Sequence, residues 1–565
     1  MSSAGRCLQR WSRLRISASW TFVSCSRVGS SINACSRRQR GLREETRGHE
    51  MAGERVLEPR RLERDRRRAR RERQQPNIVP PGLEGGRYKP LRDKDVRRIH
   101  EASLEVLERT GIEVVPSECR EMFRQAGARL DAENNRLFIP RSMVEDALAT
   151  ARNEVALCGR DPKHDIVLGG RRVYMGTGGA AIKVLDLESG LARATTLADV
   201  ARIGRLVDAL ANIHFYLRAC VAQDIPPENL DVNTYYAALA NTTKHVTGNC
   251  FSVKTVREVG EMAAMIAGGR EALAERPLIS LVTCWTVSPL RYAPETVEVL
   301  TEALRLGLPV FLSSAPQAGA TSPAALAGTL VQINAEELSG ITYAQLVRPG
   351  APVVLGYVPS VSDLRTGNFV GGAPEFALMH AAVAQLGQFY NLPVYNSSGL
   401  SDSKLPDIQA GYEKGMTGLA AALAGANYIH HSAGFLESML TVAYEQYVID
   451  DDINAAIMRM VRGIEVTDET LSVDLIDQVC RGEGHYLGTQ QSLALMHTEY
   501  CYPHTADRRR REDWEADGGL DMRERARHRA RNILASHVPE PIPSEIDAAI
   551  RERFEILLPK GAGSR

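Results

Sequence analysis

Eight short segments rich in Ser, Thr, Asn, Gly and aromatic side chains follow apolar runs along this 565-residue chain. They lie at residues 176–179, 223–224, 248–250, 285–288, 314–319, 357–363, 397–404 and 430–437. One pair of adjacent histidines, His430 and His431, occurs among them, and no carboxylate pair evidently joins it. No Ser-His-Asp arrangement is recognisable either. These residues would line a polar and aromatic pocket with no evident metal centre or proton-transfer group.

Eight apolar, β-branched runs precede or overlap these segments, and we expect each to form a strand. The runs are residues 173–177, 213–221, 245–251, 279–287, 310–314, 353–358, 394–398 and 428–432, with starts 31 to 43 residues apart. Helical spacing fills the gaps at residues 197–210, 232–240, 256–267, 294–306, 323–346, 375–389 and 411–423. Prolines at 277, 309, 352 and 393 would end a preceding helix and favour an extended entry into the next strand.

Eight strand–helix units predict an α/β protein with a (β/α)8 TIM-type barrel. A doubly wound open sheet is the alternative. It would usually carry a GxGxxG or P-loop after an early strand, and residues 176–179 lack that spacing. Because barrels carry their chemistry where strands end and loops begin, the eight polar segments form the candidate site.

The barrel is expected over residues 171–460, after an α+β cap at residues 76–170 and before a helical extension at residues 461–565. Residues 1–75 hold 20 Arg, no Lys and 8 acidic residues, and we expect a disordered basic leader there. A start site assigned too early would produce such a leader, with Met51 as the alternative start. The composition of residues 1–43 also resembles a mitochondrial transit peptide.

Charge and composition argue against several classes of protein. The net charge of zero leaves a balance of −12 after residue 75, which disfavours nucleic acid as a partner. No apolar span of about 20 residues occurs, so we expect no membrane-spanning segment. The ten cysteines form no CxxC pair, which argues against a disulfide framework and a thiolate zinc cluster. A reducing, cytoplasmic location fits this pattern.

Several motifs resemble the trimethylamine methyltransferase family. They are residues 333–336, 345–352, 371–375, 397–404, 407–414, 431–434 and 497–500, and Asp507-Arg508 with Trp514. The resemblance spans roughly residues 90–535 and implies a barrel fold. It also implies transfer of a methyl group from a methylated amine to the cobalt of a corrinoid (cobalamin) carried by a separate protein. The chain contains no Asp-x-His-x-x-Gly motif, so we expect no tightly bound corrinoid. We also expect a homo-oligomer.

One departure from the family separates its branches. The archaeal trimethylamine enzymes use pyrrolysine, and this chain has Leu400 at our best placement of that slot, within residues 398–401. The resemblance therefore points to the branch without pyrrolysine, which demethylates quaternary amines such as glycine betaine, proline betaine and carnitine. A quaternary ammonium already carries a good leaving group, a neutral tertiary amine, so its demethylation moves no proton.

The candidate site residues follow from this reading. Leu400, Asp402 and His431 are candidates for catalytic positions. The aromatic faces of Trp285, Tyr357 and Tyr395 are candidates for binding the cation of a substrate. The polar groups of Asn249, Gln317 and His430 are candidates for binding its carboxylate. Tyr428 and Asp224 are further candidates for binding the cation. No protein ligand to a metal is expected.

Each candidate also has a structural interpretation. Trp285 and Tyr357 would fill layers of the barrel, His431 would be a core histidine, and Asp402 would pair with Lys404. Residues 450–452, three consecutive aspartates, are expected at the exposed end of the last barrel helix. Three other functions stay open: a tertiary-amine methyltransferase, a lyase or aldolase, and a non-catalytic quaternary-amine binding protein.

Overall fold

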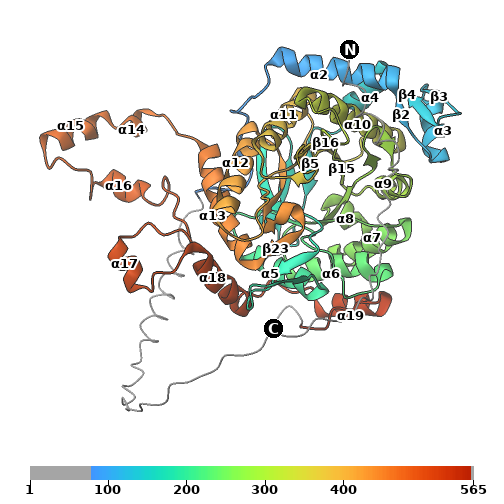
Figure 1. The fold of residues 1–565 in the computed structure, drawn as a ribbon. Helices are drawn as coiled ribbons and strands as arrows, with labels where there is room; N and C mark the ends of the chain where they lie inside the picture. Colours follow the sequence, from blue (N-terminus) through green and yellow to red (C-terminus); the bar gives the residue numbers. More distant parts are fainter. Residues whose placement is uncertain (1–77, 562–565) are drawn as a thin grey trace, which may run out of the picture. The chain divides into compact units, whose positions relative to one another are not determined.

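Eight parallel strands and the short antiparallel edge strand β1 (Leu83–Glu84) form the nine-stranded central sheet of this α/β protein (Figure 1). The computed structural model describes residues 78–561, so the predicted leader at residues 1–75 lies outside the described part. In chain order the parallel strands are β7 (Arg172–Thr177), β10 (Tyr216–Leu217), β11 (Val246–Gly248), β12 (Ile279–Thr283), β15 (Val310–Ser314), β17 (Val353–Tyr357), β20 (Val394–Ser397) and β21 (Tyr428–Ala433). From β10 to β21 each strand pairs in parallel with the next, and β21 pairs with β7. A single bridge between Gly176 and Phe215 joins β7 to the segment that leads into β10.

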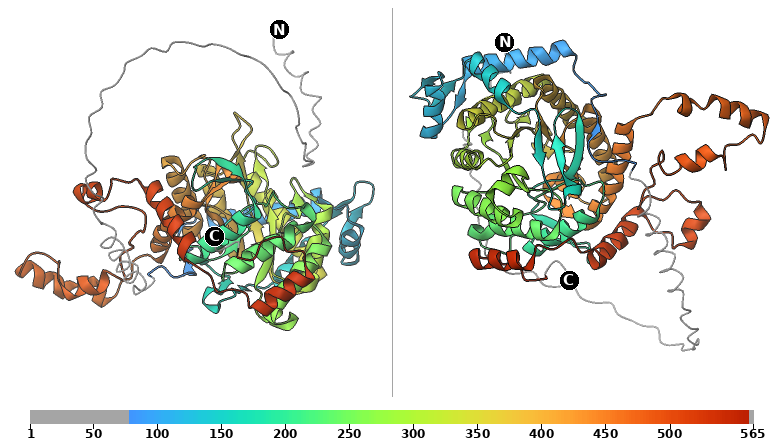
Figure 2. Two further views of the ribbon diagram at one scale, coloured as in Figure 1. Left: turned by 90° about the horizontal axis from the view of Figure 1, so that it is seen from below. Right: turned by 180° about the vertical axis from the view of Figure 1, so that it is seen from behind.

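A helix follows each of these strands, and the helices surround the sheet (Figures 1 and 2). They are α5 (Leu197–Ala209), α6 (Leu230–Asn241), α7 (Val253–Ala267) with the short α8 (Arg270–Glu275), α9 (Pro294–Leu306), α10 (Leu326–Val347), α11 (Pro374–Tyr390), α12 (Ile408–Ala424) and α13 (Tyr444–Arg462). Local signals set several of their ends. Pro294 occupies the first turn of α9, and Gly307 ends that helix with a φ of 76°, which glycine adopts without strain. The predicted eight strand–helix units are therefore present.

The side chains on the face of the sheet that the helices do not cover pack against one another. Tyr174, Phe215, Phe311, Tyr395 and Tyr428 belong to one buried cluster. The hairpin of β5 (Val155–Leu157) and β6 (Ile166–Leu168) contributes its apolar residues to the same cluster. After β5, the Cys158 N–H donates to the carbonyl of Pro277, just before β12, so the hairpin covers the amino ends of the strands. The carboxyl ends are left for the site.

The N-terminal segment shares a sheet with the core. Strands β2 (Ile112–Glu113), β4 (Arg136–Phe138) and β3 (Arg129–Asp131) join β13 (Thr286–Val287) and β14 (Arg291–Tyr292), which lie in the connection from β12 to α9. Helices α2 (Asp93–Glu105), α3 (Ser117–Gln125) and α4 (Arg141–Thr150) complete the segment. The domain boundary at residue 170 stays a prediction.

Two small sheets, which the sequence patterns did not predict, lie in the connections after the strands. One contains β16 (Gln317–Ala318), β18 (Ser360–Ser362) and β19 (Phe369–Val370). The other contains β8 (Lys183–Leu185), β9 (Ala192–Ala194), β22 (Phe435–Leu436) and β23 (Thr441–Ala443). Their strands have two or three residues, too short for a periodic hydrophobic signal.

The C-terminal extension is helical. It contains α14 (Asp468–Leu471), α15 (Val473–Arg481), α16 (Gln490–Leu495), α17 (Arg511–Ala516), α18 (Met522–Ser536) and α19 (Ser544–Arg553). Arg523 on α18 pairs with Glu445 on α13 at 3.1 Å, and Arg551 on α19 donates to the hydroxyl of Tyr236 on α6 at 2.8 Å. Within residues 78–561, none of the helices has the length and hydropathy needed to cross a bilayer.

The three aspartates at residues 450–452 are not the exposed end of a helix, as expected from their charge. All three lie inside α13 and are buried. Each carboxylate has its own partners: Asp450 pairs with Lys414, Asp451 accepts from the Asn212 N–H, and Asp452 accepts from the N–H groups of residues 504–506. The expectation was wrong because helix α13 is covered by the strand-end loops and by the C-terminal extension.

Candidate active site

Aromatic and polar side chains gather at the carboxyl ends of β12, β15, β20 and β21. The rings of Tyr395 and His430 stack at 3.9 Å between centroids, and the Tyr395 hydroxyl lies 3.2 Å from His430 Nδ1. Cys284, one residue past β12, is exposed to solvent. Burial among the strand ends still raises the pKa of its thiol, while a hydrogen bond with Ser313 and the charge of Arg218 oppose the rise. Solvent therefore reaches the strand ends beside this group.

Both neighbouring histidines are held in the neutral form. The Gly179 N–H donates to His431 Nε2 at 3.3 Å, so the proton lies on Nδ1, which is 2.8 Å from Ser397 Oγ. Burial lowers the pKa of His431 to about 3. Burial and the neighbouring His431 and His380 lower the pKa of His430 well below 6.5. Neither imidazole is a stored acid at neutral pH.

His430 keeps one ring nitrogen free of partners. Its side chain is buried, and Nε2 makes no hydrogen bond within the described part of the chain. If Tyr395 donates its hydroxyl proton to Nδ1, Nε2 carries the remaining proton as an unused donor. His431, in contrast, has both nitrogens engaged and a φ of 65°, so it fixes the backbone of β21.

Asp402 binds loops together. Its two carboxylate oxygens accept from the N–H groups of Gly371 and Gly372 at 2.9 and 3.1 Å, and Oδ1 also accepts from Ser438 Oγ at 2.6 Å. Lys404 donates to the backbone carbonyl of Asp402, so the expected ion pair between these side chains is not formed. The carboxylate therefore holds the connections after β17, β20 and β21 in register, and the structure gives it no free oxygen for catalysis.

Leu400 is completely buried. A side chain added at Gly371 would have its Cβ 3.0 Å from Leu400 Cβ, so the two residues pack closely. The carboxylate of Glu413 on α12 accepts from Ser401 Oγ and from the Asp402 N–H, which fixes the loop around Leu400. The predicted pyrrolysine slot is thus filled by an apolar side chain with no reactive group.

Trp285 and Tyr357 face helix α10. The Trp285 ring packs edge-on against Tyr292 at 4.7 Å and leaves no room for a side chain at Gly340 of α10. The Tyr357 hydroxyl donates to Asn334 Oδ1 of α10 at 2.8 Å. Both side chains are fully buried. This geometry does not support the cation-binding role expected for either of them.

The remaining candidates lie at different depths. Tyr428 is buried inside the sheet, stacked on Phe215 at 3.5 Å. Asn249 is half-buried after β11, and its side chain has no hydrogen bond to another described residue. The Gln317 amide donates to the Val361 carbonyl at 3.4 Å, and Asp224 accepts from the Leu197 N–H at 2.8 Å. Of these, Asn249 has the free polar group.

Comparison with known proteins supplies the class. The family described as trimethylamine methyltransferase (MTTB) matches residues 60–555. This chain belongs to that family. It is 40% identical over 473 residues to the trimethylamine methyltransferase MttB of Desulfitobacterium hafniense (strain DSM 10664 / DCB-2), covering 84% of this chain and 95% of that protein. It is 34% identical over 467 residues to the glycine betaine methyltransferase of D. hafniense (strain Y51), covering 82% and 96%. The chain is a methyltransferase, and the expected family is confirmed.

A solved structure is also similar. The monomethylamine methyltransferase (MtmB) of Methanosarcina barkeri aligns with a TM-score of 0.42 at 13% identity, over 80% of this chain and 96% of that one.

The sequence analysis of this methyltransferase did not identify three residues at the strand ends as candidates for the site. They are Arg218, Phe251 and Cys284. The predicted strands ran to residues 221, 251 and 287, whereas the observed strands end at Leu217, Gly248 and Thr283. The three residues were therefore assigned to strands, although they lie just past the strand ends. A charged residue inside an apparently apolar run was the available signal for Arg218.

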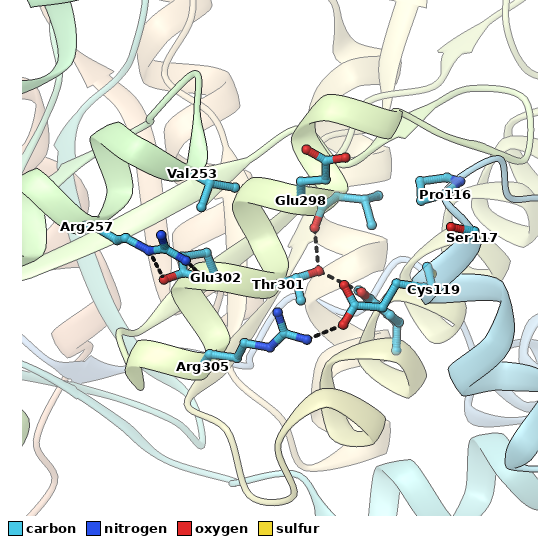
Figure 3. Close-up of a pocket in the computed structure, with 12 residues that line it drawn as sticks. Pro116, Ser117, Cys119, Val253, Arg257, Glu298, Thr301, Glu302 and Arg305 are labelled. Carbon is cyan, nitrogen blue, oxygen red and sulfur yellow. Dashed lines mark hydrogen bonds and ion pairs between the residues drawn. The ribbon is translucent and has the colours of Figure 1, made fainter.

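A separate pocket of about 360 Å³ lies on the outer side of the helices (Figure 3). Its lining residues come from α3, α7, α9 and α10, and they include the ion pairs of Arg257 with Glu302 and of Arg305 with Glu118. None of its lining residues belongs to the strand-end segments. Within residues 78–561 no three His, Cys, Asp or Glu side chains are placed to hold a metal ion.

Proposed function

We propose that this methyltransferase moves a methyl group from a quaternary, betaine-type amine to Co(I) of a corrinoid carried by a separate protein. The observation that carries the proposal is Leu400, an apolar and completely buried side chain at the position predicted for pyrrolysine. A tertiary amine needs a proton or a covalent adduct before it can leave. Leu400 cannot form an adduct, and a tertiary amine protonated in solution would have to bind with its N–H paired to a buried acceptor, which a quaternary amine does not require.

The proposed step balances without a proton. Co(I) supplies the electron pair of the new bond to the methyl carbon and is oxidised by two electrons. The C–N bond breaks with its pair left on nitrogen, so a neutral tertiary amine leaves. The protein then has to bind, align and desolvate the substrate, and most of the acceleration comes from orientation.

Within that step, His430 and Asn249 are the proposed polar contacts. His430 Nε2 is a buried ring nitrogen without a partner, and the Asn249 amide is free in the described structure. Tyr395 orients His430 through its hydroxyl and through ring stacking. Gln317 stays a proposed contact through its place in β16, in the connection that follows β15. Asp402 and His431 are proposed as residues that position the loops.

We further propose that the eight parallel strands form a closed (β/α)8 barrel. The pairing of β21 with β7 and the bridge from Gly176 to Phe215 support closure. The corrinoid is proposed to arrive on its carrier, and the chain to act as a homo-oligomer. All seven cysteines of the described part are free thiols, which supports a reducing, cytoplasmic location.

The experiment is a methyl-transfer assay with the purified full chain and cob(I)alamin, followed by the loss of Co(I) absorbance. Glycine betaine, proline betaine, carnitine and trimethylamine are compared at equal concentrations. We expect transfer from at least one betaine and little or none from trimethylamine. Turnover of trimethylamine equal to or above that of every betaine would overturn the proposal.

The alternative is a tertiary-amine methyltransferase. The relative at 40% identity is named a trimethylamine methyltransferase, and it is more similar to this chain than the glycine betaine enzyme is. Overall identity does not report on the few residues that contact a substrate. The same assay decides between these two functions.

A further inference from the structure

Arg218 carries a buried charge without an ion pair. The residue follows β10 directly, and its N–H continues the ladder by donating to the Thr247 carbonyl at 2.9 Å. Its side chain is 7% exposed, and Nε is buried without a hydrogen-bond partner. Among the described residues, no group accepts a hydrogen bond from its guanidinium. Buried charges in proteins are normally paired, so the Arg218 guanidinium lacks the hydrogen-bond acceptor expected for it.

None of the described neighbours of Arg218 provides that acceptor. Its guanidinium carbon lies 6.0 Å from the centroid of the Phe251 ring, in the loop between β11 and α7. Burial lowers the pKa of Arg218, and Asp231 on α6 is the main charge that opposes this effect. Asp231 forms no direct ion pair with Arg218: its Oδ2 accepts from the Phe251 N–H and from Thr255 Oγ1, and its Oδ1 is buried without a hydrogen-bond partner in the described structure.

The guanidinium also acts on the candidate site. Its positive charge opposes the rise that burial causes in the pKa of the Cys284 thiol at the end of β12. The same thiol contributes to raising the pKa of Tyr395, whose ring stacks on His430. Arg218 lies at the carboxyl end of β10, next to the loop after β11 that carries Phe251.

We propose that Arg218 binds the carboxylate of the substrate and so selects carboxylated quaternary amines over simple tetraalkylammonium ions. A planar guanidinium donates two parallel hydrogen bonds to a carboxylate, a geometry that lysine cannot reproduce. A betaine places its carboxylate one short linker from its ammonium group. With the carboxylate on Arg218, the methylated nitrogen is directed away from that positive charge.

The proposal rests on the proposed function, and three ligands separate the two. Glycine betaine carries both charges, tetramethylammonium carries only the cation, and 3,3-dimethylbutanoate is the carboxylate in which carbon replaces nitrogen. Binding of each to the full chain is measured by calorimetry, without cobalt. In Arg218→Gln we expect about 10- to 100-fold weaker binding of the two carboxylates and unchanged binding of tetramethylammonium.

Two further variants separate a binding role from a structural one. Arg257→Gln removes an exposed arginine of the outer pocket, 2.7 Å from Glu302, and should leave all three affinities unchanged. Arg218→Met removes an unpaired buried charge, so its ligand-free Tm should rise by about 1–3 °C. A lower Tm with retained betaine affinity would instead assign Arg218 to a water-bridged pair with Asp231 and overturn the proposal.

Failure of the proposed function and failure of the proposed role of Arg218 give different results. Absence of methyl transfer from every quaternary amine overturns the proposed function, whereas carboxylate binding to Arg218 is still measured with 3,3-dimethylbutanoate. Unchanged carboxylate affinity in Arg218→Gln, equal losses for all three ligands, or no carboxylate binding by the wild type would each overturn the role of Arg218.

Discussion

Lys414 Nζ lies 3.1 Å from Asp450 Oδ2, and the two side chains are 1% and 0% exposed. Lys414 also donates to the Gly399 carbonyl at 2.6 Å and the Phe435 carbonyl at 3.1 Å. Asp450 accepts from the Gly434 N–H at 2.6 Å. The pair thus ties helices α12 and α13 to the loops that follow β20 and β21. The loop after β20 carries Leu400, and the loop after β21 begins close to His431. The ion pair therefore fixes the backbone next to both candidate site residues.

Removing one partner of this pair should be costly. Lys414→Met leaves Asp450 buried without its cation, and we expect the free energy of unfolding to fall by about 3–5 kcal/mol. Urea denaturation measures the change. The control is Arg481→Met, which breaks the pair of Arg481 with Asp477 on α15; that pair is 79% and 61% exposed and should contribute less than about 1 kcal/mol. Similar losses in both variants would contradict the interpretation.

Other loops are held in the same way. Glu336 on α10 accepts from Ser288 Oγ at 2.8 Å, from the Leu290 N–H at 2.9 Å and from Ser314 Oγ, so it joins the connections after β12 and β15. Glu413 and Asp402 do so after β20. Asp402, a catalytic candidate from the sequence, therefore serves as an anchor like Glu336 and Glu413, because N–H groups at strand ends need acceptors once water is excluded.

Acid should destabilise the protein through His431. Burial lowers its pKa from 6.5 to about 3, so between these values the unfolded chain binds a proton that the folded chain does not. Stability therefore rises with pH across this window and falls as the pH drops below 6.5. At pH 5 the single histidine accounts for about 2 kcal/mol. His214 has its pKa lowered to about 3 by the same cause and adds to the slope.

Urea denaturation at pH 7 and pH 5 tests this dependence. His431→Gln should show a smaller loss between the two pH values than the wild type does. His485→Gln, at a side chain that is 56% exposed, should behave like the wild type. An unchanged difference in His431→Gln would mean that His431 is protonated in the folded protein.

Trp285 should matter for folding and not for substrate choice. Its ring fills the space between β12 and α10, so Trp285→Leu should lower the free energy of unfolding by about 2–4 kcal/mol. Glycine betaine and 3,3-dimethylbutanoate should bind the variant as they bind the wild type. Selective loss of the cationic ligand in calorimetry would restore Trp285 to the site.

The regular elements of this fold could be predicted from sequence because their signals are local. Strand β15 (Val310–Ser314) and helix α9 (Pro294–Leu306) occur at the predicted residues. Proline starts that helix, glycine ends it, and Pro309 precedes the strand. Strands β10 and β11 are much shorter than their apolar runs, because a run continues into buried loops without changing composition.

The candidate site was harder to predict because the facing of a side chain depends on register. Val354 and Val358 belong to the cluster inside the sheet, so the alternation of β17 turns Tyr357 toward the helices. Likewise Val282 faces inward, which places Cys284 on the inner side and Trp285 on the outer side. A sequence gives the alternation but not which of the two faces is inside, and a slip of one residue exchanges them.

Phe251 offers the last test, because it is an exposed aromatic ring beside a charge that would hold the substrate. Its side chain is 61% exposed and lies 6.0 Å from the Arg218 guanidinium carbon. A betaine held through its carboxylate places its ammonium within reach of this ring, and such a contact contributes about 0.5–2 kcal/mol. Phe251→Leu should therefore weaken binding of glycine betaine by about 3- to 30-fold. The carbon isostere 3,3-dimethylbutanoate should bind as before, because it has no cation to meet the ring.

Phe251→Tyr keeps the ring face and should retain the wild-type affinity. Since the side chain is exposed, Leu and Tyr should both leave the unfolding midpoint unchanged. Equal weakening of glycine betaine and 3,3-dimethylbutanoate in Phe251→Leu would show loss of an apolar contact and no interaction between the ring and the cation.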